Sequence, residues 1–349
     1  MINVLTLDET LKDQENLVSL CRDRELVTSE VFAPNDYYGN ATILKMYADL
    51  PQSYSLKVVI PHAISFSMTQ TTKPEAEFPL PIVFCYPSYR KKTFEEKTRK
   101  FVINSSCPFL YLVDLLAEHS SPNRVGTIFF PSHSTHHVEA RYDVNQVAEK
   151  LLALDPKYRP ITICLYWKDV ISGVHESYSR YGFNVVSAGH VYDPLFQFRF
   201  YHLCSLYKYS ASNELTSSMF FSIAAGCNFL FIDQINTKYL ADEDTLKRDR
   251  PIIPVALETE LKSVFKVERD FVTEEQNKLT RFFLGAEHKM TPSEMRMHFL
   301  LAEILDKAGY LRFHNTTLVL SPWLTRVLTR LRRQILDIVK FYYTPTRRK

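Results

Sequence analysis

The chain has 349 residues, of which 46% are hydrophobic and 23% charged, and its formal net charge is +3. This balance is typical of a globular protein and excludes a disordered chain, and the length suits two domains. No stretch approaches the roughly 20 uninterrupted apolar residues of a membrane-spanning helix, and the first residues lack the pattern of a signal peptide. The six cysteines show no CxxC spacing, so we expect reduced thiols in a cytoplasmic protein.

Short runs rich in β-branched and aromatic residues alternate with helical patterns along most of the chain. We predict strands over 3–7, 26–33, 56–62, 81–87, 125–132, 160–167, 183–189, 207–213 and 227–233. Several of these runs are apolar throughout, which is typical of parallel strands covered on both faces. Helices are predicted over 144–154 and 217–226, and helical patterns continue from about residue 255 to the end.

Strand–helix alternation on both sides of about residue 120 predicts an α/β fold with two domains, each built on a parallel sheet. The polar segment 117–126, which contains proline and glycine, is the predicted crossover. We therefore expect one domain over 1–120, a second over 121–300, and C-terminal helices with a basic tail over 301–349.

The charge is unevenly distributed along the chain. The residues from Pro322 onward carry eight Lys or Arg against one Asp, a charge of +7, which leaves −4 for the preceding residues. Segment 323–339 also places its apolar residues near one helical stripe. Such a helix suits an anionic membrane surface, with a terminal helix packed on the body as the alternative. Nucleic-acid binding is not expected, because the basic charge is confined to the tail.

Ligands of open parallel sheets bind beyond the carboxyl ends of the strands, so the residues that follow each strand are the site candidates. In the second half these are His133, Ser134, Gly189, Asn213, Thr216, Ser217 and Ser218. The last three open a predicted helix, whose free N–H groups form a ready anion site, although a serine or threonine there can also be a plain helix cap.

The segment Thr127–Val138 places three histidines within five positions where a strand ends. A zinc site would need a helical frame or nearby cysteines for His133, His136 and His137, and neither is present. A nucleophilic serine would need the glycines of a G-x-S-x-G elbow, which are also missing. A phosphate group held by His133 and Ser134 fits better, with surface histidines in a polar loop as the alternative.

Two residues of the first half are candidates for a catalytic base. His62 ends a predicted strand, and Asp36 lies between a strand and a predicted helix. Either side chain could take a proton from an acceptor hydroxyl if it faced the phosphate loops across a cleft. A structural histidine and a helix-capping aspartate are the alternatives.

The segments "IPHAI", "FPSHS" and "ELTSSMFFSIAAG", in this order, resemble motifs of bacterial glycosyltransferases of the GT-B type that build polysaccharides and lipooligosaccharides. The histidine and the Ser-Ser pair are similar to those of sialyltransferases, although Ala63 stands where such families have a glycine.

The resemblance implies two Rossmann-like domains facing each other across a cleft, an acceptor domain followed by a nucleotide-sugar domain. It implies inverting transfer from a nucleotide-activated sugar, such as a CMP-activated acidic sugar, to a saccharide or lipid-linked glycan. No metal and no cofactor besides the donor are expected. A nucleotide-sugar epimerase or hydrolase, or a catalytically silent membrane-associated protein, remain the alternatives. The implied location is the cytoplasm, with peripheral attachment to the inner membrane as a variant.

Overall fold

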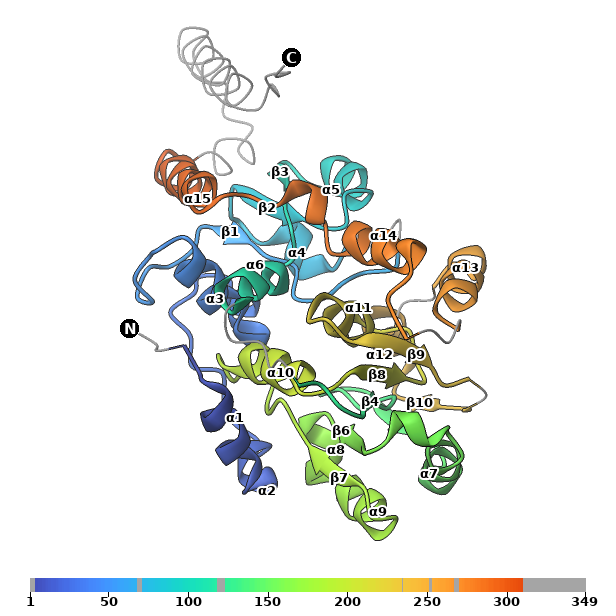
Figure 1. Ribbon diagram of the computed structural model, residues 1–349. Coiled ribbons are helices and arrows are strands. Elements are labelled where there is room, and N and C mark those ends of the chain that lie inside the picture. Colours follow the sequence, from blue (N-terminus) through green and yellow to red (C-terminus); the bar gives the residue numbers. More distant parts are fainter. Residues whose placement is uncertain are drawn as a thin grey trace, which may run out of the picture.

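The computed structural model describes residues 4–67, 71–117, 123–233, 235–250, 253–266 and 270–309. Two parallel sheets and their covering helices make up this α/β protein (Figure 1). None of the helices in these ranges is long and apolar enough to cross a membrane. The basic segment 323–349 lies outside the described residues.

The first sheet is small and wholly parallel. Its strands, in spatial order, are β1 (Val58–Val59), β2 (Ile82–Cys85) and β3 (Phe101–Asn104). The helices of this half are η1 (Ala33–Gly39), α3 (Asn40–Tyr47), α4 (Lys73–Glu77), α5 (Arg90–Lys97) and α6 (Pro108–Leu115).

The second sheet has five parallel strands. Their spatial order is β7 (Asn184–Val186), β6 (Ile161–Cys164), β4 (Thr127–Phe130), β8 (Tyr209–Ser212) and β9 (Asn228–Phe231). Numbered in chain order, the strands lie in the spatial order 3-2-1-4-5, which is that of the first five strands of a Rossmann sheet. The strand order reverses between β4 and β8. The sequence prediction of an α/β fold with parallel sheets is thus confirmed.

Helices cover both faces of the second sheet. One face packs on α7 (Val144–Leu152), α8 (Trp167–Ile171) and α9 (Val174–Arg180). The other face packs on α10 (Phe196–Ser205) and α11 (Ser217–Ala224). Alternate residues of β4 divide between the two cores: Phe129 joins the first, and Ile128 and Phe130 join the second. This alternation is what a two-sided strand requires.

The remaining elements border these layers. A two-stranded antiparallel ribbon pairs β5 (Glu139–Arg141) with β10 (Lys238–Leu240). The other helices are α1 (Leu7–Gln14), α2 (Leu17–Leu20), η3 (Pro156–Tyr158), α12 (Glu243–Asp249), α13 (Val255–Phe265), α14 (Glu274–Phe283), η4 (Ala286–His288) and α15 (Pro292–Lys307). The helical character expected after residue 255 is confirmed for the described residues.

The largest core lies between the two sheets and belongs to both. It contains Phe84 of β2, Phe130 of β4 and Phe220 of α11 within one contiguous cluster of buried side chains. Phe299 of α15 stacks on Phe84 with ring centroids 5.8 Å apart. Helices from both halves of the chain therefore cover the sheet faces that border this core. The domain boundary expected near residue 120 stays a prediction.

Two predicted strands are wrong. Over 3–7, a capping box between Thr6 and Glu9 starts α1 at Leu7 instead, because the Thr-x-x-Glu pattern satisfies two free N–H groups of a helix start. Over 26–33 the described chain has no strand, and Val27 is 93% exposed. The other predicted ranges each contain a strand. The prediction missed β3, an edge strand that is only half buried, and the short strands β5 and β10.

Candidate functional site

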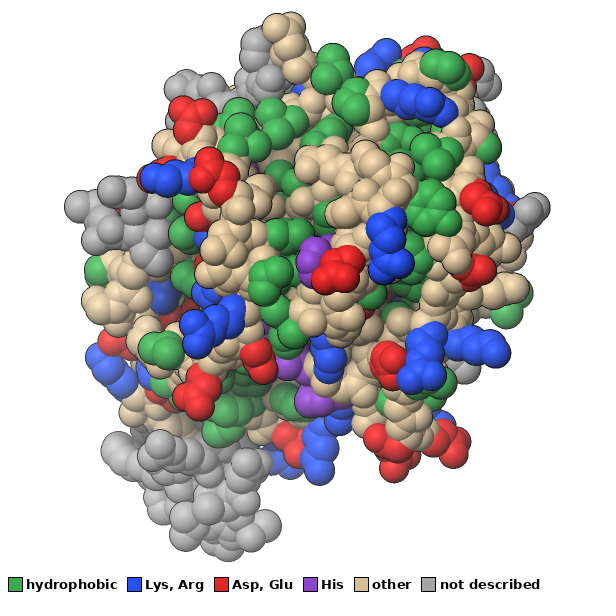
Figure 2. Space-filling view, turned by 90° about the horizontal axis from the view of Figure 1, so that it is seen from below, with side chains coloured by type: hydrophobic (Ala, Val, Ile, Leu, Met, Phe, Trp, Pro, Cys, Tyr) green, Lys and Arg blue, Asp and Glu red, His purple; other side chains and the backbone are tan. Residues whose placement is uncertain are grey.

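A cavity of about 500 Å³ lies where the loop after β1 meets the carboxyl ends of β4, β6, β7 and β8. The site residues predicted from the sequence that line it are His62, His133, Thr216, Ser217 and Ser218. On the face of the molecule shown in Figure 2, histidine side chains gather near the centre, with acidic and basic side chains beside them. The cavity therefore joins a histidine of the first half to the strand-end residues of the second.

His62 forms part of the wall that comes from the first half. Its ring contacts the edge of Tyr37, with centroids 5.7 Å apart. Burial is the main cause that lowers the pKa of His62 below its usual 6.5, opposed by the negative charge of Glu75. The imidazole is consequently neutral at pH 7, and a neutral imidazole has a nitrogen lone pair that can accept a proton.

His133 follows β4 in the opposite wall and packs on Tyr166, with ring centroids 4.9 Å apart. Burial, and after it the charge of Arg250, lowers the pKa of His133 to about 3. This imidazole is also neutral at pH 7, and one of its ring nitrogens carries a hydrogen that can be donated to an anion.

Arg250 brings a positive charge to the same wall. Its guanidinium donates a hydrogen bond of 2.6 Å to the backbone oxygen of His133 and forms a 2.7 Å ion pair with Glu214. It also lies 4.1 Å above the ring of Tyr239. Three separate contacts thus hold one charged group in place at the edge of the cavity.

The start of helix α11 faces the cavity without a side-chain cap. The Thr216 hydroxyl makes no capping bond and instead lies 2.7 Å from the Ser218 hydroxyl. The Ser217 hydroxyl accepts a 3.3 Å hydrogen bond from the backbone N–H of Ile64, in the loop after β1. Free N–H groups and the positive end of the helix dipole favour a negatively charged group at this place.

Several polar atoms of the cavity lining are buried without a hydrogen-bond partner. They are Oε2 of Glu214, the hydroxyl of Tyr239, Nε of Arg250 and Oε1 of Gln197. Buried polar groups of native proteins are nearly always paired, so each of these atoms calls for an explanation. A polar ligand in the cavity is one such explanation.

Asp36 and Gly189 do not line the cavity. The carboxylate of Asp36 accepts a hydrogen bond from the Thr28 hydroxyl. Gly189 has a φ of +95°, and a Cβ atom there would lie 3.2 Å from the side chain of Leu20. Its backbone conformation and close packing explain the glycine without a ligand.

Ser134 and Asn213 also lie outside the lining and serve as cross-links. The Ser134 N–H donates to both carboxylate oxygens of Asp169 at 3.2 and 3.3 Å, and its hydroxyl accepts from the Ala140 N–H at 3.1 Å. The side chain of Asn213 exchanges two 2.8 Å hydrogen bonds with Ser132. Both residues stiffen the strand ends that carry the cavity.

The sequence analysis missed several residues that the structure brings to the cavity. They are Tyr38, Tyr166, Glu214, Tyr239, Asp249 and Arg250. Glu214 follows a predicted strand and Tyr166 lies at the end of one, so both carried a usable signal. The segment with Tyr239, Asp249 and Arg250 carried none, because it reaches the site through the antiparallel pairing of β10 with β5.

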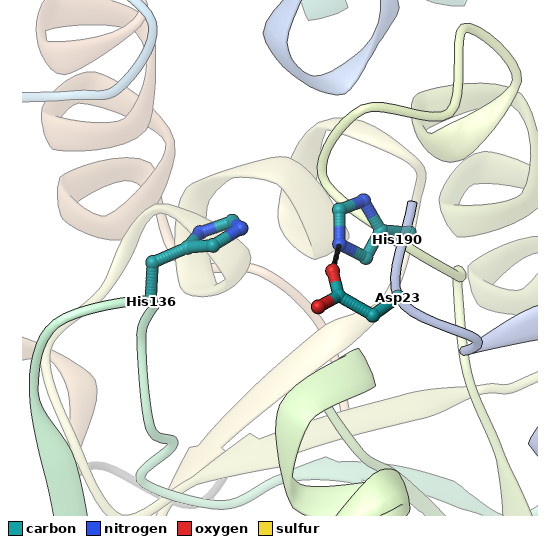
Figure 3. Close-up of side chains that lie close together, drawn as sticks. All are labelled: Asp23, His136 and His190. Carbon is teal, nitrogen blue, oxygen red and sulfur yellow. Dashed lines mark ion pairs between the residues drawn. The ribbon is translucent and has the colours of Figure 1, made fainter. Parts of the chain in front are cut away.

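Within the described parts of the chain, one set of three metal-type ligands comes together. Asp23, His136 and His190 have ligand atoms within 4.8 Å of one another (Figure 3). None of the three lines the cavity. The chemistry available inside the cavity is therefore that of two neutral imidazoles, an arginine, two carboxylates and a helix start.

Comparisons with known proteins do not identify the chain. It matches no protein-family model, no curated protein and no solved structure.

Proposed function

We propose that the protein is a glycosyltransferase that moves a sugar from a nucleotide-activated donor to a saccharide or lipid-linked acceptor. The observation that carries this proposal is the meeting, in one cavity, of His62 from the first half with His133 and the start of α11 from the second. On this proposal the two halves act as the acceptor and donor sides of a GT-B arrangement.

The donor phosphate would bind on the side of the second sheet. The uncapped start of α11 and the guanidinium of Arg250 supply N–H donors and positive charge, and His133 adds a neutral donor. Groups of this kind, fixed in position before the reaction, stabilise a departing phosphate. The apolar part of the lining, which includes Leu165, Phe196 and Phe200, suits the flat ring of a nucleobase.

The transfer step would use His62 as the base. Its neutral imidazole takes the proton of the acceptor hydroxyl while the acceptor oxygen forms a bond to the anomeric carbon of the sugar. The bond from that carbon to the phosphate oxygen breaks at the same time, and the electron pair leaves with the nucleotide. Attack from the face opposite the leaving group inverts the configuration of the anomeric carbon.

A CMP-activated acidic sugar is the donor we favour, on the resemblance to sialyltransferases. A nucleotide-sugar hydrolase in the same cavity is the second candidate, because the carboxylates of Glu214 and Asp249 also line it and could activate water. Release of free sugar from the donor in the absence of any acceptor, at the same rate as with acceptor, would favour the hydrolase.

Thermal unfolding with CMP-, UDP-, GDP- and dTDP-sugars tests the donor site. A ligand present at about 100 times its dissociation constant stabilises the native state by roughly 2.7 kcal/mol. We expect one nucleotide class to raise the melting temperature of the parent protein.

The double variant Ser217→Ala/Ser218→Ala should remain folded and lose this donor-dependent stabilisation. Ser263→Ala removes an exposed helical hydroxyl from α13 and serves as the control. If the double variant binds every tested donor as tightly as the parent, the donor does not bind at the start of α11.

A further inference from the structure

Asp23, His136 and His190 meet outside the cavity and come from three separate segments. Asp23 follows α2, His136 lies in the loop between β4 and β5, and His190 lies in the loop between β7 and α10. Figure 3 shows the side chains directed toward a common space. The proposed transfer reaction makes no use of this group.

One imidazole nitrogen near this space lacks a hydrogen-bond partner, and another pairs with the carboxylate. His190 is 0% exposed, and its Nε2 forms a 3.2 Å ion pair with Oδ1 of Asp23. The Nε2 atom of His136 is buried and has no partner. A buried imidazole nitrogen without a partner calls for an explanation, and an ion held between the three side chains would supply one.

We propose that Asp23, His136 and His190 bind a divalent transition-metal ion of the zinc type through two imidazole nitrogens and one carboxylate oxygen. Neighbouring ligand atoms of a tetrahedral zinc site lie about 3.3 Å apart when the metal–ligand bonds are about 2.0–2.1 Å long. The distance of 3.2 Å between His190 Nε2 and Asp23 Oδ1 matches this spacing. The side chain of Asp23 is 76% exposed, so it can move to close the remaining gaps and leaves a fourth position open to water.

Aromatic side chains hold both imidazole rings in place. The ring of Trp167 lies 4.1 Å from that of His190 and 4.9 Å from that of His136 between centroids. Tyr192 stacks on His136 at 5.2 Å. An apolar surround that fixes ligand orientation and limits water access is a common feature of metal sites.

One contact opposes binding of the ion. The backbone N–H of Tyr192 donates a 3.1 Å hydrogen bond to Nδ1 of His190. Ligation through Nε2 needs the ring hydrogen on Nδ1, so this bond must break when the ion enters. We therefore expect weaker binding than in structural zinc sites, whose ligands already have satisfied outer partners.

The ion would tie the segment after α2 to two loops that border the cavity. His136 lies three residues beyond His133, and Tyr192 contacts Tyr37, which in turn contacts His62. We expect the bound ion to stabilise this border of the cavity and to take no part in the transfer step.

Metal titration of the full-length protein tests this site. The protein is first freed of metal with a chelator and then titrated with Zn²⁺ against a competing indicator, or with Co²⁺, whose visible absorption reports its coordination. We expect one ion per chain. Asp23→Ala and His136→Ala should each weaken binding by at least about 10-fold, since even the loss of an outer partner has an effect of that size.

His137→Ala is the matched control, because it removes an exposed imidazole from the same loop while leaving the three ligands intact. Unchanged binding in His137→Ala, together with weakened binding in the two ligand variants, supports the site. Loss of the ion in His137→Ala would instead indicate a surface pair of adjacent histidines. Either that outcome, or the absence of stoichiometric binding by the parent, overturns the proposal.

Discussion

Burial holds both cavity histidines neutral at pH 7, although they stand in opposite walls and have different neighbours. His133 lies beside Arg250, whose positive charge further disfavours protonation of the imidazole. Burial lowers the pKa of His62, the charge of Glu75 opposes it, Arg90 lowers the pKa further, and Asp249 raises it. These negative charges favour uptake of a proton by His62, as the role of base requires.

Replacement of His62 by alanine should lower turnover by roughly 10²–10⁴-fold, the usual range for the loss of a general base. Donor affinity should be nearly unchanged, because the donor side belongs to the second half. Steady-state kinetics together with donor-dependent thermal shifts measure the two effects separately.

The pH profile gives a second readout for His62. Its pKa lies below 6.5, so the neutral form dominates above that pH, and kcat/KM should fall on acidification through the lowered pKa. The Asp36→Asn variant serves as the comparison. Full activity of His62→Ala would remove His62 from the mechanism.

At the scale of elements, the segment 26–33 shows why a predicted strand did not form. The carboxylate of Glu30 accepts hydrogen bonds from Nζ of Lys45, at 2.8 Å, and from the Leu56 N–H, at 2.9 Å. Both charged side chains are almost fully buried, with 0% and 3% exposed. The ion pair attaches the segment to α3, and the bond from the Leu56 N–H attaches it to the chain entering β1. These contacts hold the segment in place without backbone pairing to a strand.

Replacing Lys45 alone should strongly destabilise the protein. Lys45→Met leaves the Glu30 carboxylate buried without its partner, a change that typically costs about 3–5 kcal/mol. The double variant Lys45→Met/Glu30→Gln should be clearly more stable than the single variant, since a neutral amide can still accept the Leu56 N–H. Denaturant unfolding measures both free energies.

The exposed pair of Lys73 and Glu77 is the control, with its side chains 81% and 67% exposed. Lys73→Met should leave the unfolding free energy nearly unchanged, because exposed ion pairs contribute little. Equal losses of unfolding free energy in Lys45→Met and Lys73→Met would show that the buried pair stabilises the protein no more than the exposed pair.

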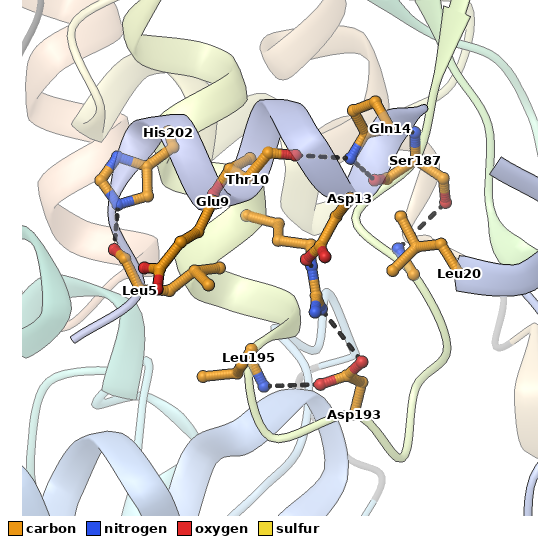
Figure 4. A network of polar contacts seen from close by, with 12 residues as sticks. Leu5, Glu9, Thr10, Asp13, Gln14, Leu20, Ser187, Asp193, Leu195 and His202 are labelled. Carbon is orange, nitrogen blue, oxygen red and sulfur yellow. Dashed lines mark hydrogen bonds and ion pairs between the residues drawn. The ribbon is translucent and has the colours of Figure 1, made fainter. Parts of the chain in front are cut away.

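At the scale of the whole molecule, the start of the described chain packs on the second half, and a segment near its end packs on the first half. Helix α1 packs on the second half, where Gln14 exchanges hydrogen bonds of 2.9 and 3.1 Å with Ser187 and where Asp13 pairs with Arg199 (Figure 4). At the other end, the loop after α14 packs on the first half, where Ser106 donates a 2.8 Å hydrogen bond to the backbone of Gly285. These exchanges, with the shared core, couple the two walls of the cavity.

The basic tail gives a prediction about membrane attachment. Each Lys or Arg near an anionic surface contributes about 1 kcal/mol, and salt screens this attraction. Truncation before Trp323 should therefore release the protein from anionic vesicles and leave donor binding intact. Sedimentation with vesicles of varied anionic content, at low and high salt, measures the release. Equal vesicle binding by both proteins, or loss of folding on truncation, would mean that the tail is a packed terminal element.

The sequence by itself determined the second sheet and part of the site. Several of its strands lie in apolar runs, and such runs have few alternatives to a buried parallel strand. Because all these strands point the same way, the residues that follow them must meet at one edge. His133 and the start of α11 both follow strands of this sheet, and both line the cavity.

The tertiary structure alone decided the rest. Asn213 and Ser134 also follow strands, but their side chains bond to Ser132 and to the Ala140 N–H of β5, a direction that position in the sequence does not fix. Arg250 reaches the site because a short antiparallel pairing far away in the sequence returns its segment to the cavity. Local sequence patterns indicate which residues are buried and where elements end. The meeting of distant segments depends on packing between elements, which local patterns do not predict.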